Sequence, residues 1–180
     1  MHKIWSLGLS MLDIITQPIS RWPDRGGAVN SETTELVLGG MALNTAVAIA
    51  KLGKVPVGLI SCIGHDVSGQ ILKTGLKELN IDITHMCFTN FENTGVAICF
   101  THPDGERSFV LCMAANNKLN ESNIDFNAFN DGDFLHIGGA MIMEGTRGEG
   151  LASILKKVRA QKITVSVTLV GMEQTNGEIF

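Results

Sequence analysis

Apolar residues recur with helical spacing between residues 36 and 53, in the segment LVLGGMALNTAVAIAKLG. The i, i+3, i+4 and i+7 positions of one buried helix face are taken by Leu43, Ala46, Val47 and Ala50. Gly53 follows where a C-cap glycine is expected, so the pattern predicts a helix that begins at Gly40 and ends at Gly53. Gly39, Gly40 and Asn44 need a separate explanation, because glycine is a poor helix former and asparagine competes for backbone hydrogen bonds.

The rest of the chain alternates between short apolar runs and further helical patterns. Buried strands are predicted at residues 3–8, 55–64, 133–139 and 163–167. A second helix is predicted after Asp66, a suitable N-cap, with its end near Asn80, and a third from Glu149 to Ala160. Their expected inward residues are Ile71, Leu72, Leu76 and Leu79, and Leu151, Ile154, Leu155 and Val158. Such alternation indicates an α/β fold, with a mostly parallel Rossmann-like sheet flanked by helices through right-handed crossovers.

Two segments, residues 14–38 and 94–114, do not fit this alternation. The first is rich in proline and glycine and includes the alternating stretch TTELVL, and the second has a Pro-Asp-Gly turn between two runs of strand formers. A turn centred on Pro103 and Asp104 would place Cys99 opposite Ser108 and not opposite Cys112. We expect the two segments to form a small separate sheet that projects from one edge of the parallel sheet.

Composition narrows the function mainly by exclusion. With 180 residues, 44% hydrophobic and 18% charged, the chain is typical of one soluble globular domain. The net charge is −4 and the sequence has no run of Lys or Arg, so it has no basic segment that would bind nucleic acid or an anionic membrane. The expected partner is a small molecule or another protein. No apolar stretch approaches the roughly 20 residues of a membrane span, and no clear cleavage site follows the apolar N-terminus. The expected location is the cytoplasm.

The cysteines indicate no metal site and no disulfide framework. Cys62, Cys87, Cys99 and Cys112 form no C-x-x-C pair and have no histidine or cysteine at metal-ligand spacing. We expect reduced thiols that lie mostly in the core.

Several residues with useful chemistry are expected to meet at one edge of the sheet. In an open α/β sheet, ligands bind outside the carboxyl ends of the strands. Asp13 is expected just past the first strand, Gly39 and Gly40 open a helix, and the segment at residues 138–144 follows a later strand. On this interpretation the glycines let backbone N–H groups approach a ligand, and Asn44 offers a donor and an acceptor. The alternative is that Gly40 only marks a turn and Asn44 lies on the outer helix face.

The segment at residues 39–69 is similar to the N-terminal signature of the ribokinase, or PfkB, family of carbohydrate and nucleoside kinases. It has the paired glycines, the asparagine four residues after Gly40, an alanine-rich helix that closes on Lys-Leu-Gly, and the turn of Gly64, Asp66 and Gly69. The similarity extends to Gly8 and Asp13, to the Pro-Asp-Gly-Glu-Arg hairpin and to Ala115-Asn116, and it continues to about Val167.

The resemblance implies an α/β domain with a small β-sheet lid, formed by the two projecting segments. The lid closes over a sugar or nucleoside whose hydroxyl receives the γ-phosphoryl group of ATP, with Mg²⁺ as the metal of the complete enzyme. By position, Asp13 would accept hydrogen bonds from two vicinal hydroxyls, Gly39 and Gly40 would give backbone contacts, and Asn44 would bind a further hydroxyl. The lid would also pair two chains into a homodimer.

Three further residues, Arg107, Asn116 and Glu144, each have two interpretations. Arg107 would contact a substrate carboxylate or phosphate, or is a solvated strand residue. Asn116 would contact substrate where the chain leaves the lid, or caps a turn. Glu144 would bind a hydroxyl from the far wall of the crevice, or is a surface carboxylate. His136, inside an apolar strand, is expected to be a core histidine with its hydrogen bonds satisfied.

The sequence departs from the family pattern in its later part. The second family signature, Asp-Thr-x-Gly-Ala-Gly-Asp, carries the catalytic base and the anion hole, and it does not occur here. Thr168 stands where relatives often have an aspartate, and residues 171–180 complete no further strand-helix unit. We therefore expect residues 1–180 to be the substrate-binding N-terminal part of such a kinase, without its own catalytic base or ATP site. The alternative is a non-catalytic sugar-binding or dimerising remnant.

Overall fold

The computed structural model describes residues 2–170. Its central sheet has the strand order β10-β9-β1-β4, and each neighbouring pair is parallel. The strands are β1 (Ile4–Gly8), β4 (Val57–Ile60), β9 (Phe134–Gly138) and β10 (Thr164–Thr168). The predicted α/β class with a mostly parallel sheet is confirmed. The expectation for residues 171–180 lies outside the described residues.

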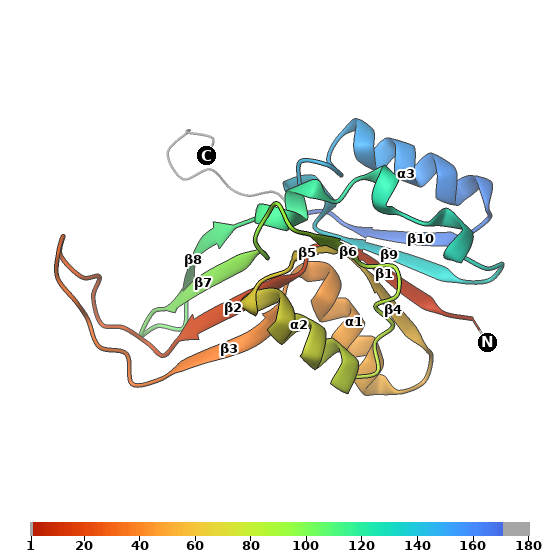
Figure 1. Cartoon of the computed structure of the whole chain (residues 1–180). Coiled ribbons are helices and arrows are strands. Elements are labelled where there is room, and N and C mark those ends of the chain that lie inside the picture. Colours follow the sequence, from red (N-terminus) through yellow and green to blue (C-terminus); the bar gives the residue numbers. More distant parts are fainter. Residues whose placement is uncertain (1, 171–180) are drawn as a thin grey trace.

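Helices cover both faces of this sheet (Figure 1). On one face, α1 (Met41–Leu52) packs against β1, β4 and β9, with α2 (Val67–Glu78) beside it, and α3 (Glu149–Ala160) lies on the other face. The helix bounds agree with the sequence prediction to within about two residues. Gly53 adopts the left-handed conformation at the end of α1, and the Asp66 side chain caps α2.

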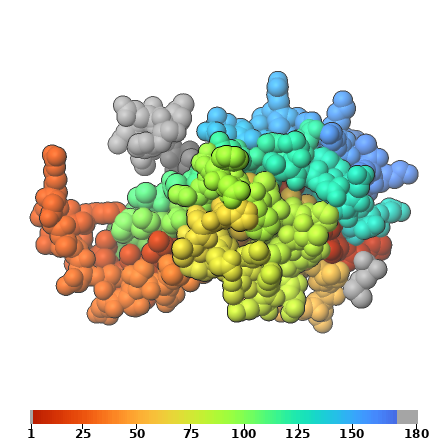
Figure 2. All heavy atoms as spheres, in the orientation of Figure 1, coloured from red at the N-terminus to blue at the C-terminus, as the bar shows by residue number. Residues whose placement is uncertain are grey.

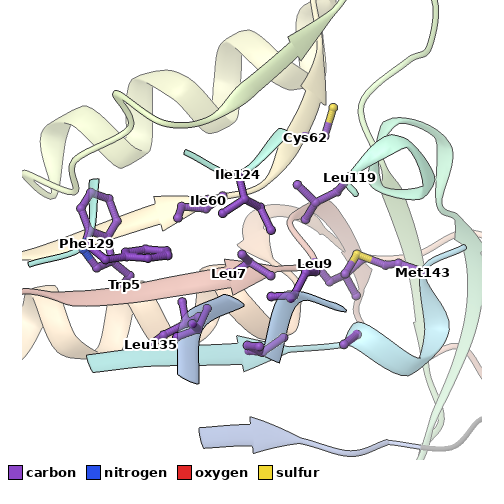
Figure 3. Close-up of a cluster of buried hydrophobic side chains, with 14 of the residues drawn as sticks. Trp5, Leu7, Leu9, Ile60, Cys62, Leu119, Ile124, Phe129, Leu135 and Met143 are labelled. Atoms are coloured by element: carbon purple, nitrogen blue, oxygen red, sulfur yellow. The ribbon is translucent and has the colours of Figure 1, made fainter. Parts of the chain in front are cut away.

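Two hydrophobic clusters hold these layers together. Figure 3 shows the cluster on the α3 side, where Trp5, Leu7 and Leu135 from the sheet meet Leu119 and Ile124. The latter two belong to a connection that contains the short 3-10 helices η1 (Ala114–Lys118), η2 (Glu121–Asn123) and η3 (Phe126–Ala128). The second cluster joins α1 and α2 to the sheet through Leu43, Ala46, Leu59, Leu72 and Leu76. A fourth 3-10 helix, η4 (Ala140–Ile142), follows β9.

A second four-stranded sheet projects from this body, and we call it the lid (Figures 1 and 2). Its strands are β2 (Met11–Thr16), β3 (Thr34–Gly39), β7 (Val96–Thr101) and β8 (Arg107–Cys112), in the order β3-β2-β7-β8. Strand β2 pairs antiparallel with β3 and parallel with β7, and β7 pairs antiparallel with β8. The two projecting segments therefore form one sheet, which begins at Met11, three residues earlier than the sequence suggested.

Two strand details differ from the sequence prediction. Residues 55–64 form two strands, because the chain leaves the central sheet at Ser61 and continues as β5 (Cys62–Gly64), which pairs with β6 (Cys87–Thr89). In the lid hairpin Cys99 pairs with Phe109 and not with Ser108. Gly105, at φ 90°, adds one residue to the turn and donates its N–H to the His102 carbonyl, which shifts the register by one.

One predicted core residue of α2 is exposed. Ile71 has 36% of its surface accessible, whereas Leu72 and Leu76 are fully buried. Ile71 lines an open groove of about 480 Å³, together with Leu38 and Val67. Lid strand β3 approaches α2 near Gly75, where a Cβ atom would lie 2.8 Å from Leu38 Cδ1, while the helix surface at Ile71 faces the open groove.

Candidate functional site

Asp13 lies past the end of β1, in the middle of lid strand β2. The chain turns at Leu9 and Ser10 after β1 and immediately starts this new strand. Asp13 pairs with Val37 of β3 on one side and with Ala97 of β7 on the other. It is half-buried at the base of the lid, and this burial raises the pKa of its carboxyl group.

Gly39 makes room for the Asp13 carboxylate. A Cβ atom at residue 39 would lie 2.1 Å from Asp13 Cγ and 2.1 Å from Oδ2, so any side chain there would displace the carboxylate. Among the described residues, none donates a hydrogen bond that lowers the Asp13 pKa, and desolvation is its only cause of shift. The lid thus presents a partly buried acceptor whose oxygens have no donor in the described chain.

Gly40 explains the other unusual residue at the helix start. It adopts φ 94°, and a Cβ there would lie 2.6 Å from the Leu9 carbonyl oxygen. That oxygen accepts hydrogen bonds from the N–H groups of Ala42 (3.1 Å) and Leu43 (3.3 Å), so these two amides are already used within the protein. Asn44 follows one turn later with an exposed side chain, and its own N–H donates to the Gly40 carbonyl at 2.8 Å.

The end of β9 contacts the start of α1, as expected for two segments that lie at the carboxyl ends of the parallel strands. Gly138 accepts a hydrogen bond from Leu9 N at 3.0 Å, and a Cβ on Gly138 would lie 2.8 Å from Ala42 N. Gly139 lies against Leu9 and the Met41 sulfur. The chain crossing from β1 to β2, the start of α1 and the end of β9 therefore occupy one small region below the lid.

Asn116 lies in the wall of this region, with no exposed surface. Its Oδ1 accepts from Ser10 N at 3.0 Å, and its Nδ2 donates to the carbonyls of Ser10 (2.8 Å) and Met113 (3.1 Å). Ser10 is also tied to Ser61 by a hydroxyl pair at 2.6 Å. Asn116 thus positions the crossing from β1 to β2. Of its two interpretations from the sequence, a direct substrate contact is the less favoured, because the side chain has no exposed surface.

Arg107 and Glu144 stand apart from the other candidates. Arg107 is exposed on the edge strand β8, on the same lid face as Asp13 by register, but about four residues, or roughly 13 Å, along the strand from the position level with Asp13. Glu144 is exposed after η4, and its backbone N–H donates to Asn117 Oδ1 at 3.2 Å. Among the described residues, the Asp13 carboxylate contacts Gly39, Asn44 donates its backbone N–H to the Gly40 carbonyl, and no hydrogen bond links Arg107 or Glu144 to them.

His136 is half-buried in β9 and contacts β10. Its Nδ1 lies 2.8 Å from Ser166 Oγ and its Nε2 lies 3.4 Å from Thr168 Oγ1. Desolvation lowers its pKa, which favours the neutral ring. These contacts agree with a histidine whose hydrogen bonds are satisfied within the sheet.

Sequence reasoning missed the residues that hold the lid to the body. Thr94, buried just before β7, and the Ser10–Ser61 pair have no pattern of their own in the sequence. Asp66 accepts hydrogen bonds from Thr94 and so belongs to the same set of residues. Asp66 is the member that has a sequence signal, as a helix cap and as part of the Gly-x-Asp-x-x-Gly turn. Within residues 2–170 no group of three His, Cys, Asp or Glu side chains is arranged to hold a metal ion, and no helix is long and apolar enough to cross a membrane.

The candidate site thus lies where a helix opened by paired glycines begins at the carboxyl edge of a parallel sheet, with the carboxylate of a lid strand against the first of those glycines. The chain belongs to the pfkB family of carbohydrate kinases, whose family model matches residues 1–173. It is 36% identical to a ribokinase of Haemophilus influenzae over 96 residues, which cover 53% of this chain and 31% of that protein. It is 34% identical to a nucleoside kinase of Methanocaldococcus jannaschii over 128 residues, which cover 69% of this chain and 42% of that protein.

Solved structures agree with this assignment. The fructokinase of Xylella fastidiosa superposes with a TM-score of 0.79 over 99% of this chain and 56% of that one, at 23% identity, which is evidence for the fold alone. The Methanocaldococcus jannaschii nucleoside kinase gives a TM-score of 0.69 at 29% identity, over 93% of this chain and 52% of that one. The chain therefore spans less than half the length of the two relatives compared by sequence, and about half of the two compared by structure.

Proposed function

We propose that this chain is the substrate-binding part of an ATP-dependent carbohydrate kinase, which transfers a phosphoryl group from ATP to a sugar hydroxyl. One observation carries the proposal: the Asp13 carboxylate lies half-buried over Gly39 at the base of the lid, with desolvation as the only cause of its pKa shift. An ionised carboxylate is an acceptor-only group, so it pairs with hydroxyl donors. Two vicinal hydroxyls match its two oxygens.

Asn44 and the lid surface supply the remaining contacts. The exposed Asn44 side chain lies one helical turn from Gly40 and offers one donor group and one acceptor to a further hydroxyl. Val37, the β3 neighbour of Asp13, is 38% exposed and provides an apolar flank for the carbon face of a sugar ring. Arg107, Asn116 and Glu144 remain secondary candidates, with Asn116 acting through Ser10.

A nucleoside substrate is the second candidate. The 34% identity to the Methanocaldococcus jannaschii nucleoside kinase supports it, because ribose in a nucleoside also has vicinal hydroxyls. A binding panel that includes both free sugars and adenosine separates the two.

ATP and Mg²⁺ would be bound by residues outside this chain. The Asp-Thr-x-Gly-Ala-Gly-Asp signature, which in the family carries the catalytic base and the anion hole, does not occur in residues 1–180. Phosphoryl transfer needs donors for the transferring group, a metal against the phosphates and a base at the acceptor hydroxyl. We therefore propose that the 180-residue chain alone binds substrate without turning over ATP. The alternative remains a non-catalytic sugar-binding or dimerising remnant in the cytoplasm.

Calorimetric titration with ribose, fructose, 2-keto-3-deoxygluconate and adenosine tests the binding site. Asp13→Ala should weaken the best ligand at least tenfold, because loss of one hydrogen bond to a charged group, about 1.5 kcal/mol, gives that factor. Asp131→Ala removes an exposed aspartate elsewhere and should leave affinity unchanged. An affinity of the Asp13 variant equal to that of the wild type would refute the assignment of Asp13 to substrate binding.

ADP release tests the proposal that the 180-residue chain alone does not turn over ATP. Sugar-dependent ADP release by this chain, at the rate of a longer chain that carries the second signature, would refute that proposal.

A further inference from the structure

The Gly-x-Asp-x-x-Gly turn is a sequence motif that the substrate site does not use. In the structure its aspartate, Asp66, binds Thr94, the residue that leads into lid strand β7. Asp66 Oδ1 accepts from Thr94 Oγ1 at 2.6 Å and Oδ2 accepts from Thr94 N at 2.8 Å. Asp66 Oδ1 also accepts from Gly69 N at 2.8 Å and so caps α2. One carboxylate thus joins a helix of the body to the root of the lid.

The two glycines of the motif are shaped around the same threonine. A Cβ at Gly69 would lie 2.7 Å from Thr94 Oγ1 and 2.2 Å from the Gly64 carbonyl oxygen. A Cβ at Gly64 would lie 2.8 Å from Thr94 N, and the Gly64 N–H donates to Thr94 Oγ1 at 2.9 Å. Thr94 itself is only 2% exposed. The whole motif therefore encloses Thr94.

Thr94 is connected directly to the strand that carries Asp13. The next residue, Gly95, accepts a hydrogen bond from Leu12 N at 3.0 Å, and two residues later Ala97 pairs with Asp13. A Cβ at Gly95 would lie 2.3 Å from Asn116 Nδ2, so the same backbone also packs against the residue that holds Ser10. A displacement of Thr94 would move β7, and with it the backbone on both sides of Leu12.

We propose that Asp66 is a positioning residue for substrate binding: through Thr94 it fixes β7 against β2 and so sets where the Asp13 carboxylate stands. The claim that Asp66 affects substrate binding rests on the proposed function. The claim that Asp66 fixes β7 against β2 rests on the hydrogen bonds alone. A helix cap would need only one acceptor for Gly69 N. The use of both carboxylate oxygens on Thr94 is the additional feature that couples the cap to the lid.

Two substitutions break the coupling in different ways. Asp66→Asn keeps a good N-cap residue but replaces one acceptor oxygen by an NH₂ group, so one of its bonds to backbone N–H is lost. Thr94→Val keeps the shape and removes the hydroxyl, leaving the bond from Gly69 N to Asp66 intact. Thr94→Ser restores the hydroxyl and serves as the rescue variant. Asp125→Asn makes the same change at a helix cap far from the lid, where Asp125 caps η3.

Hydrogen exchange of the 180-residue chain tests the coupling without any ligand. Asp66→Asn and Thr94→Val should accelerate amide exchange at least tenfold in residues 11–16 and 96–101, while β1 and β9 keep wild-type rates. Thr94→Ser and Asp125→Asn should match the wild type. Unchanged exchange in the lid strands, or equal acceleration in β1 and β9, would overturn the inference, because the effect would then be absent or global.

Titration with the best sugar of the panel then tests the substrate part. The dissociation constant should rise at least tenfold in Asp66→Asn and Thr94→Val and recover in Thr94→Ser. Weakening by Asp13→Ala but not by these two variants would overturn the positioning role and leave the proposed function intact. If the wild type binds no sugar, the proposed function fails, and the exchange result alone decides whether Asp66 positions the lid.

Discussion

The Asp13 carboxylate fills the space that a side chain at Gly39 would occupy, with Cγ 2.1 Å from the position of a Cβ atom. The strand register explains this contact. Met11 pairs with Gly39 and Asp13 pairs with Val37, so Asp13 and Gly39 are diagonal neighbours on one face of the lid. Gly39 is thus a glycine because of the carboxylate beside it, and the two residues form one unit of the site.

Gly39→Ala should weaken sugar binding at least tenfold without removing any ligand-binding side chain. The added methyl group pushes the Asp13 carboxylate away from its place, whereas the backbone conformation of Gly39 is not left-handed and accepts alanine. Isothermal titration with the best sugar measures the effect. Gly27→Ala is the control, because Gly27 lies in the exposed connection between β2 and β3, its backbone is not left-handed, and the nearest atom to the new methyl group is the Asp24 carbonyl oxygen at 3.1 Å. Full affinity in Gly39→Ala would show that the position of the carboxylate does not matter.

Asp13→Asn should raise the melting temperature at neutral pH while abolishing tight sugar binding. Burial raises the pKa of Asp13 in the folded chain, so the folded state binds the proton more tightly than the unfolded state does. The ionised carboxylate therefore lowers stability above the folded-state pKa, and this loss disappears as pH falls through that pKa.

Thermal unfolding of wild type and Asp13→Asn, at neutral and at mildly acidic pH, checks the sign. Asp13→Asn should have a higher melting temperature than the wild type at neutral pH, and this difference should shrink at acidic pH. Asp131→Asn should have the melting temperature of the wild type at both pH values. Sugar affinity of the wild type should fall over the same acidic range, because a protonated carboxyl group loses its acceptor charge. A gap that widens at low pH would contradict this assignment.

Asn116→Ala should destabilise the fold by about 2–3 kcal/mol, because the buried N–H and C=O of Ser10 lose their partner. Urea unfolding followed by tryptophan fluorescence measures the loss. Asn127→Ala, at an exposed position, should change stability little. If Asn116→Ala unfolds like the wild type but binds sugar poorly, Asn116 is a ligand contact and not a positioning residue.

We expect the lid to pair two chains, because it exposes apolar side chains on a sheet that has a free edge at β8. Leu36 is 58% exposed and Val110 is 56% exposed, on the same lid face by register. Light scattering at tens of micromolar should report a dimer in the wild type and a monomer in Leu36→Glu/Val110→Lys. Val67→Glu, on α2 with 79% exposure, is the control for a charge placed elsewhere. A strictly monomeric wild type would contradict the prediction.

Local patterns in the sequence were sufficient for the helices and most strands of the body. The periodicity of Leu43, Ala46 and their neighbours, and the caps Asp66 and Gly53, act within a few residues of chain, so α1, α2 and α3 have the predicted bounds to within about two residues. The family motifs also predict the candidate residues, among them Asp13 and Asn44, from short stretches of sequence.

The tertiary structure decided what those residues do, because contacts between distant segments leave no local pattern. It placed Asp13 on a lid strand between Val37 and Ala97, buried Asn116 against Ser10, and joined Asp66 to Thr94 across 28 residues. The sequence alone determined which segments could be helix or strand, since that depends on neighbouring side chains. Strand order, register and burial depend on which segments meet, and only the folded chain brought the carboxylate of Asp13 onto the glycine that makes room for it.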